Sequence, residues 1–289
     1  MQYLIYLIAY PLIWGISMLP FRILYLVSDL VYFVSYRIIG YRKKTVRENL
    51  KLALPKLSDK ERLVIEKKFY HHMCDMFLEM VKTMNISEKE IRKRFVFKNI
   101  DVYKEVEKHG KSIAIICSHY ASYEWIISMN YYSDFIGYGI YKQINNPYFD
   151  KLVHKIRSRF NARLITTKQT VPTIIHNNVE NILSLYGFAS DQSPKAKAAV
   201  HWAKFMGIEV PVHIGAEMLS KRYNMALLYL NTKKVSRGHY EATLEILSEH
   251  PKDVPDFELT DKYLKLLEKQ IYEAPEYYLW THKRWKYRR

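Results

Sequence analysis

His119 and Glu124 are the pair of side chains whose types and spacing best suit acid–base chemistry. A neutral imidazole takes a proton from a hydroxyl, and a carboxylate on its other nitrogen fixes the tautomer and stabilises the charged form. On a continuous helix, residues five apart lie about 140° apart around the axis. The two side chains therefore meet only if His119 lies on a loop and Glu124 lies in the first turn of the helix that follows. The hypothesis is that His119 is a general base and that Glu124 orients it.

The spacing alone does not establish this chemistry. Eleven histidines and 29 acidic residues in a chain of 289 give about one such spacing by chance. Structural ion pairs use the same residue types, so a purely structural role is the alternative. The position of the pair in the fold has to decide between the two interpretations.

A buried strand is predicted just before His119. Residues 112–117 form a short apolar run, which is typical of a strand buried on both faces. Doubly wound α/β proteins place their functional residues where strands end and helices begin. His119 lies at such a point, which favours the catalytic interpretation.

The rest of the chain alternates helical and extended patterns. Capping boxes at Ser58 to Glu61 and at Ser87 to Glu90 predict two helix starts. Further helices are predicted at residues 121–131 and 147–160, and further strands at residues 136–141, 163–166, 182–188, 225–230 and 240–246. This alternation predicts an α/β domain with a central, largely parallel sheet flanked by helices.

The first forty residues predict a membrane anchor. Tyr3 to Pro20 carry no charge, and as a helix they span roughly 27 Å, close to the hydrocarbon thickness of a bilayer. A signal peptide fits poorly, because no Lys or Arg precedes the run and no small-x-small site follows it. Residues 21–40 are apolar but carry three charges, which indicates an interfacial or packed helix. A buried helical hairpin in a soluble protein is the alternative.

The chain is therefore divided into an anchor at residues 1–40, with one spanning helix plus an interfacial helix, and a single domain at residues 41–289. Four cations between residues 41 and 47 flank the apolar segment. Cations in this position are retained on the cytoplasmic side and attract anionic lipids. The domain at residues 41–289 is expected on the cytoplasmic face.

The amino-acid composition of the chain narrows the classes of partner that it is expected to bind. The chain has 45 Lys and Arg against 29 Asp and Glu, a net charge of +16. Its 15% aromatic content excludes a disordered chain, and its two cysteines exclude a disulfide scaffold. An anionic partner is expected: nucleic acid, an anionic membrane or an acidic protein. Because the sequence has no recognised nucleic-acid module and cations beside aromatic residues equally suit a membrane surface, no nucleic-acid partner is predicted.

Other candidate sites are supported by weaker sequence signals. His71, His72, Cys74 and Asp75 are metal-ligand types, but their helical phases scatter them around the axis, so no metal site is predicted. Cys117 ends the buried strand, where a thiol usually serves packing. The sequence has no Gly-x-Ser-x-Gly elbow and no Gly-rich phosphate loop.

Five blocks of sequence, in order along nearly the whole chain, resemble the lipid A late (secondary) acyltransferase family, membrane-bound relatives of the glycerophosphate acyltransferases. The blocks are YRKKTVRENLKLALP, SHYASYEW, GIYKQINNPYFDKLVHKIRSRF, YGFASDQSP and APEYYLWTHKRWK. Five ordered blocks are far more specific than one His-x₄-Glu spacing.

The resemblance implies a glycerolipid-acyltransferase-like fold and transfer of a fatty acyl group from acyl carrier protein to a hydroxyl of a lipid A precursor. His119 and Glu124 match the family's H-x₄-D/E block, and Asp191 and Gln192 match its Asp-Gln pair. It also implies the bacterial inner membrane, an acidic carrier and a phosphorylated glycolipid as partners. No cofactor is expected, because a thioester is already activated.

Two implied site residues have alternative interpretations. The family usually has Arg where this chain has Lys142, and lysine keeps the charge but loses the planar fork that grips phosphate. Lys142 is either a charge-stabilising residue or a solvated surface lysine. Asp191 is either functional or the start of a turn before Pro194.

Two other functions remain open at this stage. The same chemistry could act on another membrane acceptor, such as an aminolipid, a lysophospholipid or another glycolipid. A non-catalytic, basic, membrane-attached binding protein is the alternative of another class. It predicts that the side chains of His119 and Glu124 do not approach each other and that no cleft lies between them.

Overall fold

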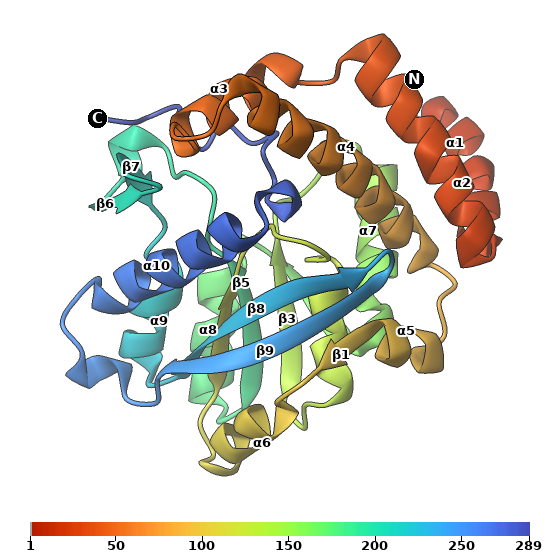
Figure 1. Cartoon of the computed structure of the whole chain (residues 1–289). Helices are drawn as coiled ribbons and strands as arrows, with labels where there is room; N and C mark the ends of the chain where they lie inside the picture. The colour runs from red at the N-terminus through yellow and green to blue at the C-terminus, as the bar shows by residue number, and fades with distance from the viewer. Residues whose placement is uncertain (1) are drawn as a thin grey trace.

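A seven-stranded sheet forms the centre of the molecule (Figure 1). The computed structural model describes residues 2–289. The strand order is β1-β9-β8-β2-β5-β3-β4, and every neighbouring pair is parallel except β8 with β9. The strands are β1 Phe95–Phe97, β2 Ile113–Cys117, β3 Ile136–Tyr141, β4 Ala162–Thr166, β5 Ser184–Ala189, β8 Ala226–Ser236 and β9 His239–Ser248. The prediction of an α/β domain with a largely parallel sheet is confirmed.

The apolar run before His119 forms the middle strand of this sheet. All five residues of β2 are buried, and β2 pairs in parallel with β8 on one side and β5 on the other. Each strand predicted from the sequence is present. The pair β6 His201–Phe205 and β7 Ile208–Val212 forms a separate antiparallel sheet that the sequence patterns did not predict.

Helices flank the sheet, and the predicted capping box opens the longest of them. The backbone N–H of Ser58 donates to Glu61 Oε2 at 2.7 Å, and the N–H of Glu61 donates to Ser58 Oγ at 3.3 Å. The α-helices are α1 Gln2–Met18, α2 Phe21–Tyr32, α3 Lys43–Ala53, α4 Asp59–Lys82, α5 Glu88–Arg94, α6 Ile100–Lys108, α7 Pro147–Arg157, α8 Thr170–Val179, α9 Gly215–Tyr223 and α10 Glu258–Glu273.

The segment after His119 is not the regular helix predicted at residues 121–131. Ala121 adopts a left-handed backbone with φ of 49°, and a 3₁₀-helix follows at Trp125–Tyr131. Left-handed backbone is unfavourable for a residue with a Cβ, so it interrupts the helical pattern. Glu124 precedes the 3₁₀-helix as its N-cap residue.

The N-terminal helices lie together along α4 (Figure 1). Helix α1 has 17 residues, and α2 continues as a π-helix, Phe33–Ile39, that ends at Gly40. Among residues 2–289, no single helix combines the length and hydropathy of a membrane span; Phe21–Ile39 and Lys43–Ala53, bent by 92°, reach those values only together. The predicted spanning helix at Tyr3 to Pro20 is therefore not confirmed and stays a prediction.

Many large apolar side chains on these N-terminal helices are exposed. They are Tyr3, Leu4, Ile5, Leu7, Ile8, Leu12, Trp14, Met18, Ile23, Leu26, Leu30, Val31, Phe33, Val34, Ile38 and Ile39. An accumulation of exposed apolar side chains of this kind usually marks an interaction with a membrane or a protein. We call it the N-terminal apolar face.

Candidate active site

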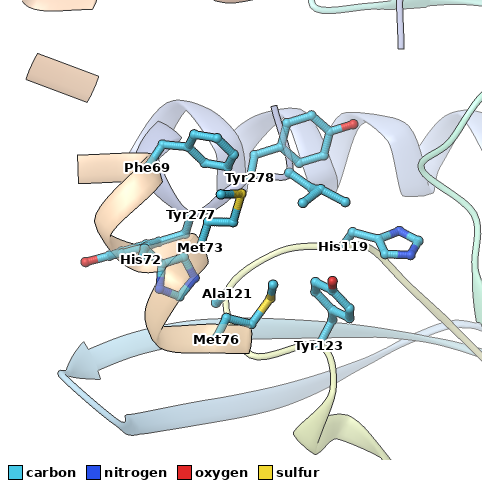
Figure 2. Close-up of a pocket in the computed structure, with 10 residues that line it drawn as sticks. Phe69, His72, Met73, Met76, His119, Ala121, Tyr123, Tyr277 and Tyr278 are labelled. Atoms are coloured by element: carbon cyan, nitrogen blue, oxygen red, sulfur yellow. The ribbon is translucent and has the colours of Figure 1, made fainter. Parts of the chain in front are cut away.

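His119 lies two residues beyond the end of β2, at the centre of the sheet edge. Its imidazole is 22% exposed. Figure 2 shows the ring at one end of a small pocket. The other lining residues are Phe69, His72, Met73, Met76, Ala121, Tyr123, Tyr277, Tyr278 and Leu279. The histidine therefore has a largely apolar recess on one side.

Asp191 is the carboxylate that holds the imidazole. It follows β5, which pairs with β2 so that Ala189 lies opposite Cys117. His119 Nδ1 lies 2.7 Å from Asp191 Oδ1, and the backbone N–H of His119 donates to the same oxygen at 3.1 Å. Two parallel strand ends thus place two side chains, 72 residues apart in sequence, in direct contact.

The charges of this pair support each other. Burial lowers the pKa of His119, but the Asp191 carboxylate and its hydrogen bond outweigh burial and raise that pKa overall. Burial raises the pKa of Asp191, and the contacts with His119 outweigh it and lower that pKa. Since an ionised carboxylate only accepts, Nδ1 carries the proton and Nε2 is left to accept one. The Nε2 atom of the imidazole is therefore the nitrogen that is free to accept a proton.

Gln192 lies against this free nitrogen. Its side-chain Nε2 is 3.4 Å from His119 Nε2. With the Asp191 contact on Nδ1, the amide donates and the imidazole accepts. The Asp-Gln pair singled out in the sequence therefore contacts both nitrogens of His119.

Glu124 has a different partner from the one expected. Its carboxylate accepts from Arg157 of α7 at 2.8 Å from Nε and 2.5 Å from Nη2. Within residues 2–289, none of the hydrogen bonds of Glu124 goes to His119, so the orienting contact assigned to Glu124 belongs to Asp191. The left-handed Ala121 turns the chain differently from the predicted loop and helix, and Tyr123 packs on the imidazole with ring centroids 4.9 Å apart. The charge of Glu124 still favours the protonated form of His119.

Arg157 is the site residue that the sequence analysis missed. Burial lowers its pKa, and the contacts with Glu124 outweigh burial and raise it. A signal was present, because a buried carboxylate requires a cation and Arg157 lies in a matched block. Four other cations in the same block, Lys142, Lys151, Lys155 and Arg159, made the choice of partner ambiguous from sequence.

Lys142 follows β3 at the same edge of the sheet and is exposed. In the described part of the chain it makes no hydrogen bond or ion pair with His119, Glu124 or Asp191. The structure thus brings together His119, Asp191 and Gln192 and places Glu124 with Arg157 beside them. Lys142 is exposed after β3 and, within the described residues, contacts none of the acidic residues named above.

Cys117 and the possible metal cluster are explained by packing and charge. Burial raises the pKa of Cys117 to about 12, as expected of a packing thiol. The fold brings Asp29 beside His71 and Asp75, with ligand atoms within 4.8 Å of one another, a contact that the phases of one helix could not reveal. Arg237 binds both carboxylates, at 2.5 Å to Asp29 and 2.7 Å to Asp75. The guanidinium already pairs with both carboxylates of this cluster.

The fold is an α/β domain with a histidine–aspartate pair at the end of its central strand. The chain belongs to the bacterial lipid A biosynthesis acyltransferase family, whose model matches residues 1–287. It is therefore an acyltransferase, and the hypothesis of a non-catalytic binding protein is set aside.

Three curated relatives agree with this family. A lipid A biosynthesis lauroyltransferase of Escherichia coli K12 is 22% identical over 96% of this chain and 89% of its own length. A lipid A biosynthesis palmitoleoyltransferase of the same organism and a lipid A biosynthesis acyltransferase of Shigella flexneri are each 23% identical over the same shares. These relatives are bacterial enzymes of lipid A biosynthesis, and the family supports acyl transfer in that process.

Proposed function

We propose that this protein transfers a fatty acyl group from an acyl carrier protein thioester to a hydroxyl of a lipid A precursor. The observation that carries the proposal is the contact of His119 Nδ1 with Asp191, which leaves Nε2 as an acceptor at the end of the central strand. The membership of the chain in an acyltransferase family supplies the reaction class.

In the proposed reaction, His119 Nε2 takes the proton of the acceptor hydroxyl while the oxygen attacks the thioester carbonyl. The carbon–sulfur bond then breaks, and the imidazolium returns the proton to the leaving thiolate. Asp191 stabilises the imidazolium through Nδ1 and fixes its orientation. Gln192 lies next to His119 Nε2, so its side chain is displaced when the acceptor hydroxyl binds there.

The charged residues around the pair have binding roles in this proposal. Glu124 favours the imidazolium electrostatically and holds Arg157 in place, and Arg157, which is partly exposed, in turn presents a positive charge close to the reacting atoms. The exposed Lys142 attracts the phosphate of the acceptor, which a point charge does with little directional demand.

The location of the protein is also a proposal. We infer that residues 1–40 attach it to the bacterial inner membrane, because the N-terminal apolar face is exposed and cations follow it. The domain at residues 41–289 then lies on the cytoplasmic face, where an acyl carrier protein is available.

The test is transfer of a labelled acyl group in membranes that contain the protein. His119→Ala is expected to lower the rate by about 10³-fold or more, as loss of a general base does. His176→Ala, an exposed histidine on α8, is the matched control and should retain full activity. Unchanged transfer by His119→Ala would refute the mechanism.

The acceptor is tested separately. Mass spectrometry of total lipids from cells with and without the protein should show lipid A lacking one acyl chain when the protein is absent. Unchanged lipid A together with loss of an acylated aminolipid, lysophospholipid or other glycolipid would transfer the same chemistry to that acceptor.

A further inference from the structure

Residues 277–285 form a strap that contacts both loops carrying the reacting pair. This segment follows α10 and runs back past α3 and α4 toward the C-terminus near β6 and β7 (Figure 1). It belongs to the last of the matched blocks, to which the proposed chemistry gives no role. Its hydrogen bonds connect it to the His119 loop and to the Asp191 loop.

The strap binds the His119 loop through its backbone. The N–H of Leu279 donates to the carbonyl of His119 at 3.1 Å, and the N–H of Ala121 donates to the carbonyl of Tyr277 at 2.9 Å. Tyr120 and Tyr278 form an antiparallel bridge between these two bonds. The loop that carries the base is therefore paired with the strap like a short strand.

The same strap binds the Asp191 loop through side chains. Ser193 Oγ donates to the carbonyl of Arg284 at 2.6 Å, and Arg284 Nη1 donates to Ser193 Oγ at 2.8 Å. The N–H of Ser193 donates to His282 Nε2 at 3.3 Å. Burial lowers the pKa of His282 to about 4, so its imidazole stays neutral and continues to accept this bond. Three contacts thus fix a residue two positions from Asp191.

Arg284 is an unusual residue for this position. It is 1% exposed, and among residues 2–289 its Nε and Nη2 atoms have no hydrogen-bond partner. Its remaining contacts are a bond from Nη1 to the carbonyl of Pro211 at 3.0 Å and the ring of Phe205 at 5.1 Å. Burying a guanidinium with so few partners costs free energy, so the residue is a poor means of stabilising the fold alone.

Asn49 of α3 holds the strap from the other side. Its amide nitrogen donates to the carbonyl of Trp280 at 2.8 Å and to the carbonyl of His282 at 2.7 Å, and Asn49 is 4% exposed. The strap is therefore fixed to α3 between its contact with His119 and its contact with Ser193.

We propose that Arg284 is a positioning residue, which acts through Ser193 to hold Asp191 against His119. The strap sets the distance between the two loops because it binds both. Loss of the Arg284–Ser193 contact loosens the Asp191 loop while the His119 loop stays paired with the strap. The predicted effect on the rate of acyl transfer rests on the proposed function, whereas the predicted effect on the titration of His119 does not.

The first test follows the titration of His119 by NMR in labelled protein without substrate. Ser193→Ala and Arg284→Lys should each shift the titration of His119 to lower pH, because burial continues to disfavour the charged ring while the Asp191 contact weakens. Arg288→Lys, an exposed arginine in the same tail, is the matched control and should titrate like the parent. An unshifted His119 in Ser193→Ala would overturn the proposal.

The second test measures acyl transfer as a function of pH. Both variants should lose about tenfold or more in kcat, as misplacement of catalytic groups does, with the acid limb moved to lower pH. The double variant should lose less than the product of the two single losses, since both changes remove one contact. A loss of kcat in both variants without a shift of the acid limb of the pH profile would indicate a merely structural role.

The two tests separate the possible failures. If the parent protein transfers no acyl group to a lipid A precursor, the proposed function fails, and the NMR titration still decides the role of Arg284. If Arg284→Lys does not fold, Ser193→Ala decides alone, because it removes the contact and leaves Arg284 its bond to Pro211.

Discussion

Two buried carboxylates at the end of the sheet bind two different cations. Asp191 contacts the imidazole of His119, and Glu124 contacts the guanidinium of Arg157. An imidazole gains and loses its proton near neutral pH, whereas a guanidinium keeps its charge. In the proposed mechanism Asp191 is therefore coupled to proton transfer, whereas Glu124 belongs to a permanent ion pair.

Replacing Asp191 by Asn tests the first of these roles. The fold should persist, while kcat falls by about 10²- to 10⁴-fold because the imidazolium loses its stabilising charge and its fixed tautomer. Acyl-transfer kinetics measure the effect. Asp253→Asn, at an exposed carboxylate, should leave kcat unchanged.

The pH dependence of the rate follows from the raised pKa of His119. A base must be unprotonated, so kcat/KM should fall with decreasing pH along a limb centred above about 6.5, the ordinary value for histidine. In Asp191→Asn the limb should move to lower pH, because burial alone then acts on the imidazole. A limb at the same pH in both proteins would contradict the assignment of Asp191.

The ion pair of Glu124 predicts a stability effect with strong coupling. Glu124→Gln and Arg157→Met should each lower the free energy of unfolding by about 2 to 3 kcal/mol, since each leaves one charge unpaired; the 25% exposure of Arg157 keeps this below the cost for a fully buried pair. The double variant should lose less than the two single variants together. Urea unfolding measures all three, and simple additivity would show that the pair does not interact.

At the scale of elements, local sequence patterns predicted six of the seven strands of the central sheet but missed β1, β6 and β7, and long-range contacts decided how the strands pair. Each run of apolar residues is visible in the sequence, so His119 and Asp191 could both be placed at strand ends. Their contact spans 72 residues, and that of Glu124 with Arg157 spans 33, which a local pattern does not encode. Buried residues alternate with more exposed ones along β9, which is typical of an antiparallel strand with one solvated face, so the reversal between β8 and β9 had a local signal that the sequence analysis did not use.

The hairpin of β8 and β9 reaches beyond the sheet to the N-terminal helices. Its turn, Arg237 and Gly238, lies against α2, where a Cβ on Gly238 would be 1.8 Å from the hydroxyl of Tyr25. Arg237 bonds to Asp29 of α2 and Asp75 of α4. One turn thus joins the N-terminal helices to the sheet that carries the site.

Removing this guanidinium should destabilise the molecule. In Arg237→Ala, the fully buried Asp75 keeps one ion-pair partner among the described lysines and arginines, Lys234 at 3.6 Å. Because the carboxylate is then poorly compensated, the free energy of unfolding should fall by about 3 kcal/mol. Urea unfolding measures the loss. Arg222→Ala, at an exposed arginine of α9, should cost less than about 0.5 kcal/mol.

At the scale of the whole molecule, apolar and basic surfaces occupy adjoining parts of the chain. The N-terminal apolar face ends at Ile39, and four cations follow between residues 41 and 47. This order suits attachment to an anionic lipid surface, with the apolar side chains in the acyl region and the cations at the headgroups.

Vesicle binding tests this arrangement. Leu26→Asp and Leu30→Asp should each weaken binding to anionic vesicles by about tenfold or more, because each removes an apolar side chain from the lipid and adds a charge. Val200→Asp changes an equally exposed apolar residue outside the face and should bind like the parent. Equal binding by all three variants would show that the face does not contact lipid.

The bonds from Asn49 to the strap have a consequence for the order of events during synthesis. They join residues 231 and 233 positions apart, and at about 5 to 20 residues per second a ribosome needs roughly 10 to 50 s to make that length. Throughout this interval the N-terminal apolar face has been translated, while the contacts that complete the site have not. The nascent chain therefore has time to reach a lipid surface before it can catalyse any reaction.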